Sequence, residues 1–360
     1  MSSPSDKGPQ TDQQEVLQRF NMKRIIWPIL IGVLVLIYTI WKISQEDISV
    51  SDLLANTTPS NITFWLILGF GCMIMRDLGY IIRLYLLCDG KLSFRAAIEV
   101  TLLWEFVSAM SPSVVGGSPV AIWMLMKEKI AIGRGTAIIF ITIFLDEIFY
   151  LLMLPTVLLS VGSDQVFKPI LADGSLTGTG FFTSFWIAYT VIFLYTVFLA
   201  FAIFIRPQGT KKVFKRLFKT RLLNRWEEKG NKMAEDLETA SKEFRHKGVV
   251  YWIKAGAATI MSWTGRYLVL NCVLSAFTDL NLFEHTVAFA RQAIMFVLML
   301  VSPTPGSSGI AEKAFEVLFT EFSPVGLVLA LAIVWRIITY YPYVFIGIPL
   351  LPRWVARVFK

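Results

Sequence analysis

Six stretches of this chain are mostly apolar and close in length to a helix that crosses a lipid bilayer. A spanning helix needs about 20 consecutive apolar residues, a length that most of these stretches reach. Hydrophobic residues make up 55% of the chain and charged residues 17%, which is less charge than a soluble domain usually carries. We therefore predict an all-α integral membrane protein with about six spanning helices. The stretches cover residues 25–41, 64–87, 136–160, 181–205, 249–277 and 324–350.

A polar segment, residues 1–24, precedes the first apolar stretch. No small-residue cleavage site follows that stretch, so we interpret it as a retained anchor rather than a signal peptide. Residues 25–350 are then predicted to form a single transmembrane domain, with 351–360 as a short tail.

Lysine and arginine are distributed unevenly between the loops. One set of loops, which includes both termini, carries 25 of these residues, and the alternate set carries 3. Cytoplasmic loops carry the excess of Lys and Arg in membrane proteins, so the first set and both termini are predicted to be cytoplasmic. The internal loops of the cytoplasmic set are 88–95, 127–135 and 206–248. The external set comprises 42–63, 161–180, 278–286 and 303–323.

Two further segments are interrupted by proline and glycine. Segment 96–126 is broken at residues 111–119, and segment 287–320 is broken at residues 302–309. Proline removes a backbone donor and glycine weakens a helix, so neither segment is expected to be one regular helix. Each is interpreted as a re-entrant hairpin or as two short helices.

The two breaks occupy matching positions within two halves of the chain. The first half, 64–160, and the second, 249–350, are predicted to have opposite orientations in the membrane, with the basic segment 206–248 between them. This is the pattern of an inverted-topology repeat, whose paired interrupted segments indicate a binding site. The alternative is two unrelated helix breaks.

Nine charged residues inside the apolar segments stand out. Each costs about 2.5–3.5 kcal/mol at the centre of a bilayer, so we expect these groups to face protein or water and to pair with one another. In particular, we expect Asp146 and Glu147 to pair with Arg266 or Arg336. Either they form a polar cavity that receives a charged head group, or they are structural ion pairs between helices. The nine are Arg76, Asp77, Glu99, Glu105, Asp146, Glu147, Arg266, Arg291 and Arg336.

Some of these charges have a simpler explanation. Arg76 and Asp77 could pair locally. Glu99, Arg291 and also Arg83 lie near segment ends, where a long side chain can extend to the interface.

The breaks and the buried charges together define a predicted substrate-binding site. A half-helix N-terminus at membrane depth presents free N–H groups and a positive dipole, which suit a phosphate or a carboxylate. Glycines there permit close approach of the backbone. The predicted residues are Arg76, Asp77, Glu105, Pro112, Gly116, Gly117, Pro119, Asp146, Glu147, Arg266, Pro303, Pro305, Gly306, Gly309 and Arg336.

The segment 206–248 holds 13 basic and 6 acidic residues. Within it, residues 211–223 place apolar side chains on one helical face and basic residues on the rest. This pattern suits a helix lying on anionic lipid, although a loop that only sets orientation explains the charge equally well. Binding to nucleic acid is not expected.

Several kinds of catalytic and metal-binding site have no support in the sequence. There is no GxxxxGK[ST] string, no nucleophile elbow, and only two histidines, His246 and His285. Cys72, Cys88 and Cys272 show no metal-ligand spacing and are interpreted as packing residues. We therefore expect no enzymatic activity, no cofactor and no metal.

At the breaks, the sequence resembles the lysylphosphatidylglycerol synthase transmembrane-region family, also called the flippase-like domain family. It is similar to the flippase half of the bacterial multiple peptide resistance factor. The resemblance covers roughly residues 22–350 and adds Glu312 to the predicted site. It rests on Pro112, Gly116-Gly117-Ser118-Pro119, Pro303-Thr304-Pro305-Gly306-Ser307-Ser308-Gly309, Glu312 and Arg336.

The resemblance implies a function in lipid transport. The best-studied family domain exposes an aminoacylated phospholipid on the outer leaflet. Family members often have an acidic residue at the position of Ser118 and glycine where Ser307 and Ser308 stand, so the head group of this chain's substrate stays open.

We therefore expect a lipid translocase in a bacterial inner membrane, with a phospholipid, aminolipid or polyprenyl-linked lipid as substrate. Anionic or aminoacylated membrane lipids are the expected partners, and a homo-oligomer is possible. Two alternatives stay open: a secondary transporter of a small charged solute, and a non-transporting partner of a lipid-modifying enzyme.

Overall fold

The structure is a computed structural model of the whole chain. It describes residues 57–111, 117–171, 176–205, 227–300, 302, 304–324 and 326–359, together with positions 34, 37, 38, 41, 208, 209, 212 and 216. The predicted first span, 25–41, and the amphipathic segment 211–223 lie almost entirely outside the described residues.

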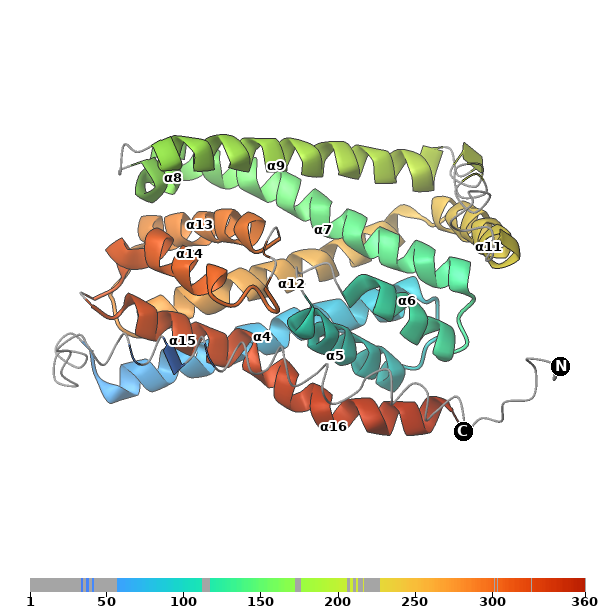
Figure 1. The fold of residues 1–360 in the computed structure, drawn as a ribbon, viewed down its shortest axis with the longest axis horizontal. Helices are drawn as coiled ribbons and strands as arrows, with labels where there is room; N and C mark the ends of the chain where they lie inside the picture. The colour runs from blue at the N-terminus through green and yellow to red at the C-terminus, as the bar shows by residue number, and fades with distance from the viewer. Residues whose placement is uncertain are drawn as a thin grey trace. The chain divides into compact units, whose positions relative to one another are not determined.

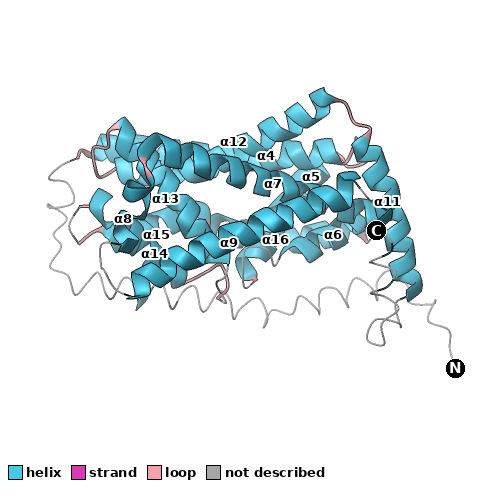
Figure 2. Ribbon diagram, turned by 90° about the horizontal axis from the view of Figure 1, so that it is seen from above, coloured by secondary structure: helices cyan, strands magenta, loops and turns pink. Residues whose placement is uncertain are grey.

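Every regular element in the described part of the chain is a helix (Figure 2). Five helical segments there are long and apolar enough to cross a membrane, which confirms the predicted all-α integral membrane class. These segments are Pro59–Leu87, Ile132–Val161, Phe182–Ile205, Leu282–Leu300 and Val328–Val358.

Four of the six predicted spans correspond to these segments. They are α4 (Pro59–Leu87), α7 (Ile132–Val161), α9 (Leu176–Ala200) with the π-helical turn η2 (Phe201–Ile205), and the pair α15 (Val328–Thr339) and α16 (Tyr341–Val358).

The predicted span 249–277 forms the helix α12, Val249–Ser275. It is not among the five segments, because Lys254, Arg266 and Asn271 interrupt its apolar character. The helix is long enough to cross a bilayer, but its polar groups require protein neighbours.

The last predicted span is divided at Tyr340. Pro342 lies two residues later, in the first turn of α16, where a proline fits a helix start but cannot continue the hydrogen bonding of the helix before it. This places Arg336 in the last turn of α15, four residues before the break.

The two interrupted segments differ in length. The first consists of α5 (Phe94–Met110) and α6 (Ser118–Lys127), both shorter than a full span. The second consists of α13 (Leu282–Leu300) and α14 (Ile310–Phe319), and α13 alone is long enough to span. The first segment therefore consists of two short helices, whereas the second joins one helix of span length to one short helix.

The extra length of α13 comes from a capping box at its start. The backbone N–H of Glu284 donates to the Asn281 side chain at 3.0 Å, and the N–H of Asn281 donates to the Glu284 carboxylate at 2.8 Å. These reciprocal bonds satisfy two donors that a helix start otherwise leaves unpaired, so the helix begins at Leu282 rather than near residue 287.

The chain divides into two compact units. Unit 1 comprises residues 1–73, 99–117 and 266–360, and unit 2 comprises residues 74–98 and 118–265. The division falls inside α4, α5 and α12, so each unit takes segments from both predicted halves.

In unit 2, α9 lies alongside α7, with the short helix α8 (Ser163–Leu171) connecting them at one end (Figure 1). At the other end, the polar helix α11 (Glu227–Arg245) packs against α7. Arg134 joins these elements because its guanidinium pairs with Glu243 of α11 and, at 2.8 Å, with Asp89.

Large apolar side chains are exposed along the candidate spans. Leu159 of α7 is 89% exposed, and Ile67, Leu194 and Phe198 are also exposed. A water-soluble protein rarely exposes so much apolar surface, whereas these side chains can contact acyl chains in a bilayer.

Candidate functional site

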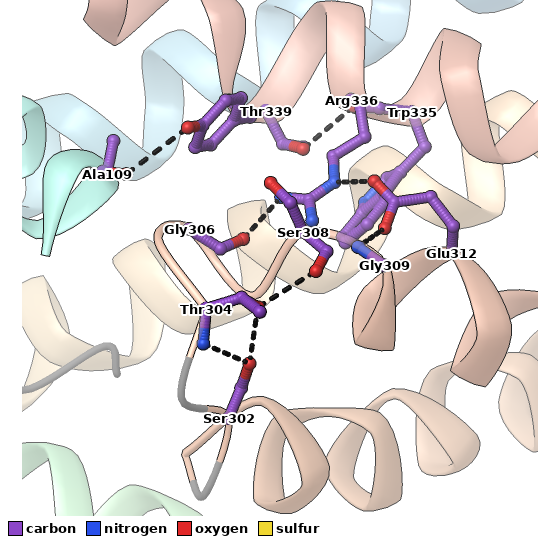
Figure 3. Close-up of polar contacts among 11 residues, drawn as sticks. Ala109, Ser302, Thr304, Gly306, Ser308, Gly309, Glu312, Trp335, Arg336 and Thr339 are labelled. Carbon is purple, nitrogen blue, oxygen red and sulfur yellow. Dashed lines mark hydrogen bonds and ion pairs between the residues drawn. The ribbon is translucent and has the colours of Figure 1, made fainter. Parts of the chain in front are cut away.

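The second break, in unit 1, is a compact loop closed by its own hydroxyl groups (Figure 3). The Ser302 and Thr304 hydroxyls lie 2.9 Å apart, and Thr304 Oγ1 donates to the Ser308 carbonyl at 2.8 Å. The Ser307 hydroxyl donates to the Met299 carbonyl at 3.0 Å, which ties the loop to the end of α13. These bonds replace the helical hydrogen bonds that the prolines remove.

Three residues of this loop have a left-handed backbone. Gly306 has φ 55°, Ser307 has φ 56° and Gly309 has φ 86°. Glycine adopts this conformation without steric cost, whereas a residue with a side chain is strained there. A Cβ at Gly306 would also collide with the Tyr340 ring, so glycine is required at that position on both counts.

Arg336 is the centre of the site. It is 4% exposed, its Nε donates to Glu312 Oε1 at 2.8 Å, and its Nη1 donates to the Gly306 carbonyl at 2.8 Å. Aromatic rings flank the guanidinium, with that of Tyr340 4.9 Å away and that of Trp335 5.5 Å away. Its Nη2 is buried and has no hydrogen-bond partner among the described residues.

Glu312 connects Arg336 to the start of α14. Its Oε2 accepts a hydrogen bond from the backbone N–H of Gly309 at 2.6 Å, while its Oε1 accepts from Arg336. One carboxylate thus lies where a helix N-terminus and a buried guanidinium both favour an anion.

The first break contacts the second within unit 1. The backbone N–H of Gly306 donates to the Ser111 carbonyl at 3.4 Å, and the Tyr340 hydroxyl donates to the Ala109 carbonyl at 3.2 Å. Both carbonyls belong to the end of α5, where helical partners are missing. The end of α5 and the second break are therefore in direct contact.

The other predicted residues around the breaks lie only partly within the described residues. Pro112, Gly116 and Pro303 lie outside the described residues. Gly117 packs so closely against α5 that a Cβ there would collide with the side chains of Ser108 and Trp104. Pro305 lies within the second break, and Pro119 is exposed in the first turn of α6.

The predicted pairing of the buried charges is partly wrong. Arg336 pairs with Glu312 of its own half rather than with Asp146 or Glu147. Arg266 lies 3.9 Å from Glu105 of the first half, so one pair between the halves does form, with a different acid. Arg76 and Asp77 pair locally at 3.0 Å, as the sequence suggested.

A second charged centre, in unit 2, is built on Asp146. The guanidinium of Arg83 donates to both carboxylate oxygens, at 2.5 and 3.1 Å, and also to the Thr259 hydroxyl at 3.0 Å. Trp263 Nε1 donates to the same carboxylate at 2.7 Å. Arg83 is 2% exposed, so the interpretation that it extends to the interface is wrong. A signal for this role was present in the sequence, because Arg83 is the next charge after Arg76 and Asp77 on the same helix.

Arg291 was likewise expected to extend to the interface, and it is instead fully buried. It pairs with Glu321 at 2.6 Å and donates to the Leu318 carbonyl at 2.9 Å, which joins α13 to the end of α14. Glu99 pairs with Arg357 of α16 at 2.7 Å. These contacts support a structural role for both residues.

A family model matches the chain over residues 25–347, and its description is the lysylphosphatidylglycerol synthase TM region. This chain belongs to the lysylphosphatidylglycerol synthase TM-region family. The match includes both breaks, Glu312 and Arg336, so the resemblance seen in the sequence is confirmed over nearly its whole extent.

A protein similar to this chain occurs in the archaeon Archaeoglobus fulgidus. It is a protein called a UPF0104 membrane protein, 25% identical in an alignment of 299 positions that covers 79% of this chain and 81% of the relative. The two proteins are therefore similar over most of their lengths.

Proposed function

We propose that this protein moves a lipid with an anionic head group across the membrane, and that the head group binds beside Arg336. The observation that carries the proposal is the buried Nη2 of Arg336, which has no hydrogen-bond partner in the described part of the chain. A buried polar group without a partner is costly, and a guanidinium presents paired N–H groups that fit a phosphate or carboxylate.

The arrangement around Arg336 also suits reversible binding. Glu312 neutralises the guanidinium and caps α14, so the resting site needs no external anion. A phosphate that binds Nη2 competes with this carboxylate for Arg336 and for the helix N-terminus. Exchange between an internal carboxylate and a head group allows binding that is strong enough to select the lipid and weak enough to release it.

The rest of the molecule suits an amphiphilic substrate. Helices of the same unit as the polar break expose apolar side chains, such as Phe345 of α16, so the acyl chains of a bound lipid can stay in hydrocarbon while its head group lies at the break. Re-entrant hairpins and an inverted repeat, with both termini cytoplasmic in a bacterial inner membrane, complete the proposal. The family's description refers to a lysylphosphatidylglycerol synthase, a lipid-modifying enzyme, which agrees with a lipid substrate.

The test is lipid movement in reconstituted vesicles of phosphatidylethanolamine and phosphatidylglycerol with a trace of fluorescent phosphatidylglycerol. Chemical quenching from outside reports how much of the probe changes leaflet. We expect the protein to accelerate exchange, and Arg336→Ala to slow it by about tenfold or more, because a hydrogen bond to a charged group contributes about 1.5–3 kcal/mol. Arg336→Lys keeps the charge but loses the planar fork, so partial activity is expected.

The matched control is Arg353→Ala, which removes an exposed arginine of α16 and should leave the rate unchanged. Folding of each variant is checked by thermal melting in detergent. A folded Arg336→Ala variant with the wild-type rate would show that Arg336 is only structural. If the wild-type protein moved no lipid but admitted a small anion, the function would be solute transport.

A further inference from the structure

Glu147 is placed at the middle of a membrane span. The helix α7 runs for 30 residues from Ile132 to Val161, and its midpoint falls between Asp146 and Glu147. The Glu147 side chain is half-buried. A carboxylate at this depth is unfavourable unless a cation or a strong set of hydrogen bonds accompanies it.

The side chain of Glu147 points toward α9. Residues three or four apart share a face of a helix. Three residues before Glu147, the Phe144 ring lies 5.3 Å from the ring of Phe204 in η2. Four residues after it, the Leu151 carbonyl accepts a hydrogen bond from the Tyr189 hydroxyl of α9 at 3.0 Å. Glu147 therefore lies on the face of α7 that packs against α9 and η2.

Asp146 lies on a different face of α7 and has its partners there. Its carboxylate binds Arg83 and Trp263, and the ring of Phe149, three residues later, stacks on Trp263 at 5.8 Å. The guanidinium of Arg83 donates to both oxygens of Asp146. It is therefore committed to Asp146 and not to Glu147.

The facing helix offers no counter-ion. Residues 176–205 contain no Lys, Arg, His, Asp or Glu at all. The titratable groups that α9 presents toward α7 are the hydroxyls of Tyr189 and Tyr195, and Tyr195 lies within electrostatic reach of Glu147.

The other elements that pack on α7 hold their charges near its ends. At its start, Arg134 is paired with Glu243 of α11 and with Asp89. Lys127 of α6 lies over the Trp123 ring, beside this start. At the far end, α8 begins directly after α7 and carries Asp164 and Lys168. Within the described residues, Glu147 forms no ion pair.

We propose that Glu147 is a proton-binding site, and that a proton is the coupling ion of the lipid movement proposed above, on which this inference partly rests. One carboxylate oxygen forms an O–H bond with a proton from the aqueous phase. The neutral acid then fits the interface between α7 and α9, where α9 carries no charged residue. When that interface opens to water on the opposite side, the O–H bond breaks and the proton returns to water there.

Infrared spectroscopy of the protein in vesicles tests the proton site directly. A protonated carboxyl group has a C=O stretching band that a carboxylate lacks. At pH 7 we expect a difference spectrum between wild type and Glu147→Gln to contain this band. The control, Glu316→Gln, changes the same functional group in an ion pair with Lys313 and should give no such band. Glu147→Asp keeps an acid at the site and should shift the band rather than remove it.

A Glu147→Gln variant that melts like the wild type but gives no carboxyl difference band would overturn the proposal. The coupling is tested separately, as the ratio of lipid exchange rates with and without a pH gradient across the vesicle membrane. The ratio should exceed 1 for wild type and fall to 1 for Glu147→Gln. Equal wild-type rates would overturn the coupling but not the proton site. A wild type that moves no lipid would overturn the proposed function and leave the infrared result standing.

Discussion

The backbone N–H of Gly306 donates a hydrogen bond to the carbonyl oxygen of Ser111, with 3.4 Å between the two atoms. Each residue lies where a helix has been interrupted, so each has a backbone group without a helical partner. This hydrogen bond pairs the free N–H group of one break with the free carbonyl of the other, at a depth where little water is available to bond either group. The contact also brings the end of α5 beside the loop that holds Arg336.

Gly306→Ala should destabilise the protein more than Gly309→Ala. Both residues have positive φ, so alanine costs about 1–2 kcal/mol at either position. At Gly306 the new Cβ also collides with Tyr340, whose hydroxyl is bonded to the Ala109 carbonyl, whereas the space at Gly309 is open. Melting temperatures in detergent measure the difference. Equal losses would mean that the Tyr340 contact is easily displaced.

Removing one partner of the Arg83–Asp146 pair should destabilise the protein strongly. Arg83→Ala leaves the half-buried Asp146 carboxylate without its cation, and breaking a buried pair costs up to about 3–5 kcal/mol. Lys313→Ala removes a pair with Glu316 in which the lysine is exposed, and should cost less than about 1 kcal/mol. The double variant Arg83→Met with Asp146→Leu should recover part of the loss. A double variant less stable than Arg83→Ala would contradict this interpretation.

Arg134 should hold α11 against α7. Arg134→Ala removes the contacts with both Glu243 and Asp89, so the backbone amides of α11 should exchange with deuterium faster. The control, Lys242→Ala, removes only an exposed pair within α11 with Glu238. Mass spectrometry of the exchanged peptides gives the readout. Unchanged exchange in Arg134→Ala would show that apolar packing alone docks this helix.

Single introduced cysteines should report the predicted topology. Lys91→Cys and Glu128→Cys flank α5 and α6 and should both react only from the cytoplasmic side, whereas Asp164→Cys should react only from outside. If Glu128→Cys reacted from outside and Lys91→Cys from inside, the first interrupted segment would cross the membrane.

The native cysteines should not react with the labelling reagent in this experiment. All three are buried. At Cys88, burial together with the nearby Asp89 raises the pKa of the thiol to about 12, even though Arg134 acts in the opposite direction. Thiol reagents attack the thiolate, so Cys88 should stay unreactive at pH 7–8 and react only near pH 12 or after denaturation. Labelling of the unmodified protein at pH 7 measures this directly.

The sequence alone determined the class of this protein and the positions where its helices fail. Long apolar stretches predict spanning helices because a bilayer demands about 20 such residues in a row, wherever they pack. Proline and glycine act on their own neighbourhood, so residues 111–119 and 302–309 are identified as breaks without any tertiary information. Helix ends were less predictable, as the capping of α13 by Asn281 and the division at Tyr340 show.

Only the tertiary structure decided which charges pair. Arg83, Arg266 and Arg336 are chemically alike and all lie in apolar segments, but their partners are Asp146, Glu105 and Glu312 respectively. An ion pair forms over a few ångströms, and which side chains come that close depends on how the helices rotate and pack against one another. Packing also decided that Asp146 received an arginine while the adjacent Glu147, on another face of the same helix, did not.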